Sequence, residues 1–289
     1  MNVGGRDGCS SHKEQVVVQT VVLLAALCCA SCAPPLLKLP TGSGLPASDG
    51  TDVVRDAIKA CQAVSTITAE IAASGSVGGQ RLSVRLLAGL AAPASVRLEA
   101  IAPFGQPAFI FVARDNDATL LLPRDRRVLE HGPPAAVLEA VAGVPLDAAD
   151  LRIALTGCAT VPRANDARQV GEDWRIVPDG RGEVYLHRES RTAPWHIVAA
   201  VHQGPGATPW RAEYRAFQRG GAADGLPAIV RLTSLNNQQF DLRLTLSQVE
   251  LNRPLEPDVF RIQSPPGTDP IALDELKRSG PLSNRSSGK

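Results

Sequence analysis

Five histidines and 29 Asp and Glu residues could do acid–base or metal chemistry, and they are scattered along this 289-residue chain. His196 and His202 lie on one expected strand and share a face, but an extended strand separates them by about 20 Å. Two ligands so far apart do not bind one metal ion. His131 lies beside a loop, without a partner at metal-ligand spacing. We therefore expect no metal site and no cofactor.

Catalytic motifs are also missing from the sequence. It contains no GxSxG nucleophile motif, no HExxH motif and no glycine-rich phosphate loop. The charge is balanced, with 30 Lys and Arg against 29 Asp and Glu, so no basic surface for a nucleic acid is indicated. The interpretation is a protein that is not an enzyme, with no catalytic residue assigned. An envelope hydrolase with an unrecognised site is the alternative.

The N-terminus carries a targeting signal. Arg6 and Lys13 precede an apolar run from Val16 to Ala30, a pattern typical of a signal peptide over residues 1–31. A membrane-spanning helix needs about 20 apolar residues, and this run is shorter. We therefore interpret it as a signal for export.

One cysteine at the end of this run is a candidate for lipid attachment. Cys32 follows Ala30 and Ser31, and these residues resemble the lipobox at which a bacterial prolipoprotein is acylated and cut. Cys29 departs from the aliphatic residue usual in that motif. Lipidation of Cys32 is the hypothesis, and ordinary secretion with incidental cysteines is the alternative.

Two cysteines remain in the mature chain, Cys61 and Cys158. In an oxidising envelope compartment such a pair could form a disulfide. Buried free thiols explain the same residues equally well, because spacing does not show whether two backbones come close enough to bond.

Composition divides the rest of the chain into three parts. Residues 32–50 hold the candidate lipidated cysteine and a segment rich in Pro, Gly, Ser and Ala, which predicts a flexible tether. Residues 51–276 are expected to form the folded body, since 44% hydrophobic content supports a sizeable core. Residues 277–289 are expected to be a disordered tail.

The body should be mainly β with some α. Thr51–Val64 has apolar residues at helical spacing after a capping Thr, which predicts a helix. Period-two alternation then predicts about ten antiparallel strands joined by short turns, typical of a curved sheet or barrel. The expected strands are at 82–86, 96–99, 108–112, 119–122, 173–177, 183–187, 195–202, 210–216, 228–235 and 242–246.

Two short helices interrupt these strands in the middle of the chain. Pro133 and Pro134 suit a first helical turn, and Gly143 suits its end. Asp147 can cap a second helix that ends at Gly157. Both helices are apolar on one side and need a surface to cover, and the concave face of the sheet is the natural one. This arrangement predicts a two-helix lid.

An apolar cavity is expected beneath the lid. Its lining should come from inward strand positions and from the apolar faces of the two helices. An aromatic content of only 4% leaves few bulky side chains to fill the interior, although a solid core, as in a small barrel, is the alternative. The expected lining residues are Leu82, Val84, Leu86, Leu98, Leu138, Val141, Leu151, Leu155, Trp210, Tyr214, Leu242 and Leu244.

Three segments in this order resemble the outer-membrane lipoprotein receptor LolB and its LolA-like relatives. They are the turn Pro103-Phe104-Gly105, LEAVAGVPLDAADLRIALTG at 138–157, and LPAIVRLTSLNNQQFDLRLTLSQVELN at 226–252. The resemblance covers residues 51–275. It implies an incomplete, unclosed antiparallel β-barrel with an N-terminal helix and a mid-chain lid, whose cavity binds acyl chains without covalent chemistry.

The resemblance also gives the turn a role. LolB is similar in having a Pro-Leu-Gly turn whose apolar residue protrudes into solvent and places lipoproteins in the outer membrane. By that match Pro103, Phe104 and Gly105 form the loop that contacts membrane and cargo. The alternative is that Phe104 folds back into the core.

Together these expectations describe a monomeric lipoprotein on the periplasmic face of the bacterial outer membrane, anchored by its N-terminal lipid. Ala33 follows Cys32, and the resemblance implies outer-membrane rather than inner-membrane retention because Asp is absent there. Its partners would be lipid or lipoprotein acyl chains and a periplasmic LolA-like carrier. The same fold could instead serve a structural or assembly lipoprotein that binds a protein partner.

Overall fold

The computed structural model describes residues 1, 35–62, 64–102, 105–158, 164–203, 208–221, 223–236 and 239–279. Apart from residue 1, the predicted signal peptide lies outside these residues, as does Cys32. The unit described below begins at Leu39. Among the described residues, no helix is both long enough and apolar enough to cross a membrane.

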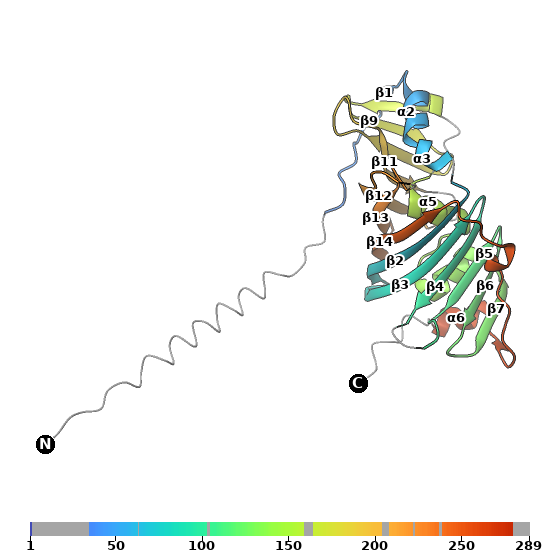
Figure 1. Ribbon diagram of the computed structural model, residues 1–289. Coiled ribbons are helices and arrows are strands. Elements are labelled where there is room, and N and C mark those ends of the chain that lie inside the picture. The colour runs from blue at the N-terminus through green and yellow to red at the C-terminus, as the bar shows by residue number, and fades with distance from the viewer. Residues whose placement is uncertain are drawn as a thin grey trace. The chain divides into compact units, whose positions relative to one another are not determined.

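Fifteen strands in the described residues form one sheet, in the order β1-β8-β9-β10-β11-β12-β13-β14-β2-β3-β4-β5-β6-β7-β15 (Figure 1). All neighbours pair antiparallel except β15 and β7, which pair parallel. The two ends of the order are β1 and β15, so the sheet is not closed. This confirms the predicted unclosed barrel, mainly β with few helices.

The first half of the sheet holds β2 to β7, whereas β1, which precedes them in the sequence, lies beside β8 at the opposite edge. Long β2 and β3 are paired along their whole length, and Ile67 to Ala73 of β2 alternate between buried positions and half-buried or exposed ones. The bounds are β1 Leu45–Pro46, β2 Thr66–Val77, β3 Gln80–Ala91, β4 Ser95–Ile101, β5 Ile110–Arg114, β6 Asp117–Leu122 and β7 Arg127–Gly132.

The C-terminal half follows the lid. Here β14 pairs with β2, which joins the two halves into one sheet. The bounds are β8 Arg168–Val170, β9 Trp174–Pro178, β10 Gly182–His187, β11 His196–His202, β12 Trp210–Phe217, β13 Pro227–Ser234, β14 Phe240–Leu251 and β15 Asp269–Pro270.

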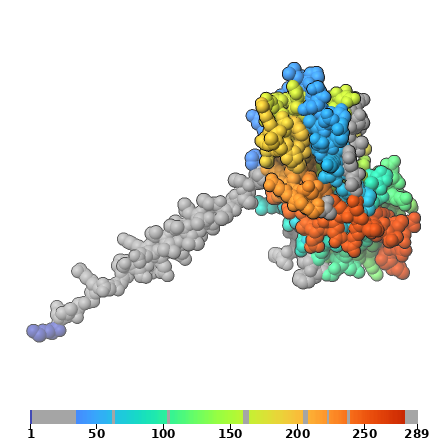
Figure 2. Space-filling view, turned by 45° about the horizontal axis from the view of Figure 1, so that its top comes forward, coloured from blue at the N-terminus to red at the C-terminus, as the bar shows by residue number. Residues whose placement is uncertain are grey.

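The predicted N-terminal helix is present as two pieces, α2 (Gly50–Ala57) and α3 (Lys59–Gln62). The fold begins earlier than residue 51, since Leu45 pairs with Gln169 of β8 and Ala47 is buried. Part of the segment predicted to be a tether therefore packs on the body. Figure 2 shows the blue surface of these N-terminal helices beside the yellow strands of the second half.

The lid helices lie where the sequence predicts them. α4 (Pro134–Ala142) begins at a proline and ends at Gly143, whose φ of 70° is a left-handed helix cap. α5 (Ala148–Thr156) is capped by Asp147, whose side chain accepts a hydrogen bond from the backbone N–H of Asp150 at 2.7 Å. Both helices contribute to one apolar core together with the sheet.

The chain returns to the lid at its C-terminal end. After the 3-10 turns η1 (Ala164–Asp166) and η2 (Pro257–Phe260), helix α6 (Leu273–Ser279) packs against α4 through Leu276, which is fully buried. Figure 1 shows α5 and α6 behind the strands β2–β7. The first three residues of the predicted tail, 277–279, thus belong to α6, and residues 280–289 lie outside the described residues.

Candidate functional site

The candidate site is a cavity of about 70 Å³ between the lid helices and the sheet. All fifteen residues that line it are apolar, so nothing in its wall can hydrogen-bond a ligand through a side chain. Inward positions of β2, β3, β13 and β14 form the floor, and α4 and α5 form the cover. The lining residues are Ile71, Ala73, Leu82, Val84, Leu86, Leu98, Phe109, Leu138, Ala142, Val144, Leu151, Leu155, Leu232, Leu242 and Leu244.

Nine of the twelve residues expected in the lining are there, and three are elsewhere. Val141 is buried but lies on an adjoining groove. Trp210 packs its ring on His202, with 4.2 Å between the centroids. The Tyr214 hydroxyl donates a hydrogen bond to the Ile153 carbonyl at 2.8 Å. Both aromatic side chains therefore support the lid from below and do not line the cavity.

Sequence reasoning missed the contribution of β2. Ile71 and Ala73 line the cavity, and Ile67 and Ala69 continue the same buried face. The period-two signal is present in TITAEIAASGSV, but two of its inward residues are alanines and the segment has few large apolar side chains. Its strand character depends on pairing with β3 and β14 on both sides.

The cavity is small. A volume of about 70 Å³ holds roughly two groups the size of a water molecule. A small-molecule pocket usually has about 300 to 1,000 Å³. The space under the lid is therefore smaller than a usual ligand site, and a larger occupant requires its walls to move apart.

A second groove, of about 280 Å³, adjoins the cavity and shares Leu82 and Ala142 with it. It runs between α4, the turn from β2 to β3, and α6. Unlike the cavity it is lined partly by polar residues: Gln80, Glu139 and Lys277 lie on its wall and are exposed.

One wall of this groove is tightly packed. A Cβ placed on Gly143 would lie 2.2 Å from Cγ1 of Val77. Glycine is therefore required at 143 for two reasons: the end of α4 adopts a left-handed conformation there, and the backbone of Gly143 lies close to Val77 at the end of β2.

An ion cluster fixes the start of α5. The Arg181 guanidinium contacts the Asp150 carboxylate at 2.6 Å and that of Asp147 at 3.7 Å. His202 Nε2 lies 2.7 Å from Asp179 Oδ2, and His202 Nδ1 lies 3.8 Å from Asp150 Oδ1. The imidazole thus lies between a carboxylate of the lid and a carboxylate of the sheet.

Strand register places these groups together. Gly182, the first residue of β10, pairs with His202, the last residue of β11. A Cβ on Gly182 would lie 1.9 Å from the Val201 carbonyl oxygen, so the close approach requires glycine. The turn just before Gly182 carries Asp179 and Arg181 toward the lid. The sequences of β10 and β11, taken one at a time, did not predict that Asp179, Arg181 and His202 would lie together.

Burial alone would lower the pKa of His202, but the carboxylates of Asp150 and Asp179 outweigh it and raise the pKa to about 9. Burial would likewise raise the pKa of Asp179, yet His202 and the backbone N–H groups of Arg181 and Gly182 lower it. The pair is therefore charged at neutral pH. Both side chains are almost fully buried, with exposed fractions of 4% and 3%.

The other end of α5 is fixed as well. Arg152 donates to the Val64 carbonyl at 2.8 Å, and Tyr214 donates to that of Ile153. Burial raises the pKa of Tyr214, so its hydroxyl remains a donor. Just beyond the helix, Cys158 forms a disulfide with Cys61 of α3, with the two Cα atoms 5.4 Å apart.

Helix α4 has no such anchors. Its one polar side chain, Glu139, forms no hydrogen bond or ion pair with any residue that the structure describes, and no described side chain bonds to the α4 backbone. The helix is held by burial of Val137, Leu138 and Val141.

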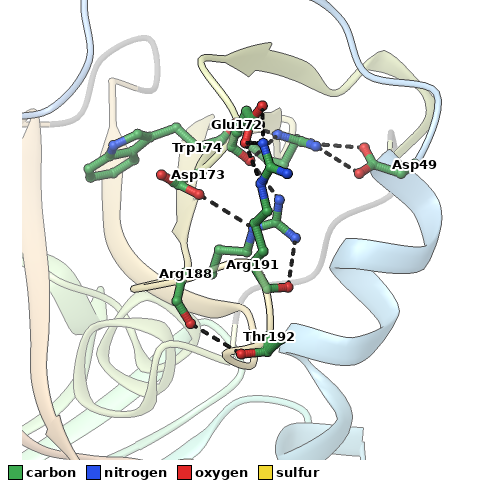
Figure 3. Close-up of polar contacts among 9 residues, drawn as sticks. Asp49, Glu172, Asp173, Trp174, Arg188, Arg191 and Thr192 are labelled. Atoms are coloured by element: carbon green, nitrogen blue, oxygen red, sulfur yellow. Dashed lines mark hydrogen bonds and ion pairs between the residues drawn. The ribbon is translucent and has the colours of Figure 1, made fainter.

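A separate polar cluster fixes the N-terminal segment to the second half of the sheet (Figure 3). Asp49, which precedes α2, accepts two hydrogen bonds from the buried guanidinium of Arg175 at 2.8 and 2.7 Å. Arg175 and Arg188 both lie over the ring of Trp195, at 4.9 and 4.6 Å. Every charge in this cluster has a partner within it, so we assign it a structural role.

Another hollow, of about 880 Å³, lies beside α2 and α3. Its wall includes Trp195, Phe217 and His196, whose ring stacks on Phe217 with centroids 4.3 Å apart. Charged residues of both signs surround these rings, which distinguishes the hollow from the wholly apolar cavity under the lid. Burial lowers the pKa of His196.

The predicted contact loop is only partly described. Pro103 and Phe104 lie outside the described residues, and Gly105 is exposed with a φ of 78°. Among the described residues, no group of three or more His, Cys, Asp or Glu side chains is arranged to hold a metal ion.

Comparison with known proteins bears on the fold. No family model and no curated protein matches the chain. The structure is similar to that of a LolA superfamily protein from Nitrosomonas europaea, with a TM-score of 0.51 and 10% identity over 74% of this chain and 97% of that one. A DUF1329 family protein from Desulfovibrio piger gives a TM-score of 0.50 and 10% identity over 75% and 98%. At this identity the similarity shows the fold alone, which is LolA/LolB-like.

Proposed function

We propose that this protein is an envelope lipoprotein that binds lipid, or the acyl chains of other lipoproteins, beneath its two-helix lid and helps deliver them to the outer membrane. One observation carries the proposal: every side chain around the cavity is apolar. The fold also supports it, because it is similar to that of a LolA superfamily protein.

The driving force is the transfer of hydrocarbon from water. Each buried methylene contributes about 0.8 kcal/mol, so a chain of about sixteen carbons represents on the order of 12 kcal/mol. A bilayer offers the same stabilisation. A carrier of this kind therefore releases its cargo by competition with the membrane and needs no chemical step.

The N-terminus and the 103–105 turn complete the proposal. Lipidation of Cys32 would hold the protein on the periplasmic face of the outer membrane as a monomer, where a periplasmic LolA-like carrier could hand over cargo. Phe104 would touch the membrane first, since burying a Phe side chain is worth about 1.5 to 3 kcal/mol and gives transient contact.

Lipid analysis tests the proposal. The Cys32→Ser protein, exported but not acylated, should copurify with lipid or acylated peptide that mass spectrometry detects after extraction. A lipid-free protein that also takes up no lipid from vesicles would contradict it. The Phe104→Glu variant should retain bound lipid but lose delivery to outer-membrane vesicles, and unchanged delivery would remove Phe104 from the account.

A protein-binding role is the second candidate, and the hollow beside α2 and α3 favours it. Its combination of Trp195, Phe217 and charges of both signs suits a peptide segment better than an acyl chain. Crosslinking in the native envelope followed by mass spectrometry separates the candidates. A single stoichiometric protein partner, with no lipid in the purified protein, would favour this role.

A further inference from the structure

The apolar cavity has no place for a polar head group. Its wall offers only hydrocarbon side chains, and a polar group buried there would lose its hydrogen bonds to water without replacement. A ligand that carries both a tail and a head must therefore leave the head outside the cavity.

The groove beside α4 is the nearest place that fits such a head. It shares Leu82 and Ala142 with the cavity, and it exposes Gln80, Glu139 and Lys277 on its wall. Its volume of about 280 Å³ exceeds that of the cavity fourfold, and it lies between α4 and α6. A tail in the cavity and a head in the groove would be continuous across these two shared residues.

The anchors of the lid indicate which side opens. α5 is fixed at its start by the Asp150–Arg181 ion pair and at its end by the disulfide of Cys158. α4 is held by apolar burial alone, and hydrocarbon contacts with a ligand can replace those contacts. Since the cavity must widen to admit a chain, α4 is the part that can move at the smaller free-energy cost.

We propose that the groove between α4, α6 and the β2–β3 turn is a head-group subsite and the entrance to the cavity, so that the ligand is an amphiphile taken up tail first while α5 stays in place. This inference rests on the proposed lipid-binding function and adds the ligand class and the route.

A competition experiment on the wild-type sequence tests the ligand class. Vesicles of phosphatidylcholine are doped with equal amounts of a lysophospholipid and the alkane of the same chain length. The protein is then reisolated, and bound molecules are identified by native mass spectrometry. We expect the amphiphiles to exceed the alkane by about tenfold, equivalent to about 1.4 kcal/mol.

The outcomes are distinct. Equal uptake of alkane and amphiphile overturns the head-group subsite and leaves lipid binding intact. Uptake of neither overturns the proposed function together with this inference.

A matched pair of variants tests the route. Ala140 of α4 lines the groove, whereas Ala149 of α5 is also half-buried but lines neither the groove nor the cavity. Ala140→Trp should slow lysophospholipid uptake from vesicles by about tenfold because the indole obstructs the groove, and Ala149→Trp should change it by less than about twofold. Circular dichroism melting of both variants checks that each is folded.

Equal uptake rates for the two folded variants would overturn the route. A variant that does not fold is replaced by the pair Lys277→Trp and Arg278→Trp, on one exposed turn of α6, of which only Lys277 lines the groove. The same difference in rate is expected within this pair, and its absence would contradict the proposal.

Discussion

The two lid helices have the same length and cover the same cavity, yet they are held in different ways. α5 is fixed by a buried ion cluster, a tyrosine and a disulfide, whereas α4 is held only by apolar side chains. Directional bonds fix one geometry, while apolar contacts can be exchanged for others at little cost. The difference teaches that a lid over an apolar cavity can be fixed by directional bonds on one side and held by apolar contacts alone on the other.

Loss of the disulfide should have the largest effect on this contrast. The Cys61–Cys158 bond closes a loop with a sequence separation of 97 residues, and a loop of about 100 residues stabilises the folded state by roughly 4 to 5 kcal/mol in the chain-entropy model. The double variant Cys61→Ala/Cys158→Ala should lose stability of this order in urea unfolding. A loss below about 1 kcal/mol would show that α5 does not depend on this bond.

Removal of one charge from the ion cluster should have the next largest effect. Asp179→Asn leaves the His202 imidazolium buried without its nearest partner, and breaking a buried pair in this way costs about 3 to 5 kcal/mol. Glu139→Ala is the control, because that exposed α4 side chain has no described partner and should change stability by less than about 0.5 kcal/mol. Equal losses in the two variants would contradict the proposed contrast.

The pH dependence of stability tests the contribution of His202 to the ion cluster, with a smaller expected effect on the free energy of unfolding. The pKa of His202 rises from its ordinary value of 6.5 to about 9 in the folded state, so the folded protein binds this proton more tightly than the unfolded chain does. The resulting stabilisation is complete below pH 6.5 and is lost as the pH rises to about 9, and it amounts to no more than about 3 kcal/mol.

Comparison with a His202→Gln variant isolates this contribution. Urea midpoints of the wild-type protein should fall between pH 6.5 and 9, and those of the variant should fall less over the same range. Parallel curves for the two proteins would mean that His202 does not carry a raised pKa.

Local sequence signals were enough for the lid and for most strands. Pro134 and the two cap glycines define the helix ends through backbone conformations that few other residues accept, and Asp147 does so through its side-chain hydrogen bond to the Asp150 N–H. Alternating apolar residues likewise predicted the inward faces of β3 and β14. These features depend on neighbours along the chain, so a single sequence contains them.

Features that depend on distant pairing were not predictable in this way. The sequence of β2 consists largely of small residues, and it forms a strand because it pairs with β3 on one side and β14 on the other. The strands β1, β8 and β15 are two or three residues long and carry no periodic signal. Trp210 and Tyr214 point inward as expected, but contacts with His202 and Ile153 place them beneath α5 and away from the cavity.

The ion cluster at the start of α5 also could not be predicted from the sequence. Asp150, Asp179 and His202 are far apart in sequence, and only the pairing of Gly182 with His202 brings the last two together. Spacing had excluded a shared metal site for His196 and His202, but it carried no information on the carboxylates that approach His202 from the lid and from the β9–β10 turn.

Hydrogen exchange measured by mass spectrometry, with and without a bound lysophospholipid, tests the central claim most directly. The account predicts that amides of residues 134–142 exchange faster than those of 148–156 in the free protein, and that the ligand protects 134–142 most. Equal exchange in both helices, with no change when the ligand is added, would contradict an apolar site covered by one fixed helix and one that yields.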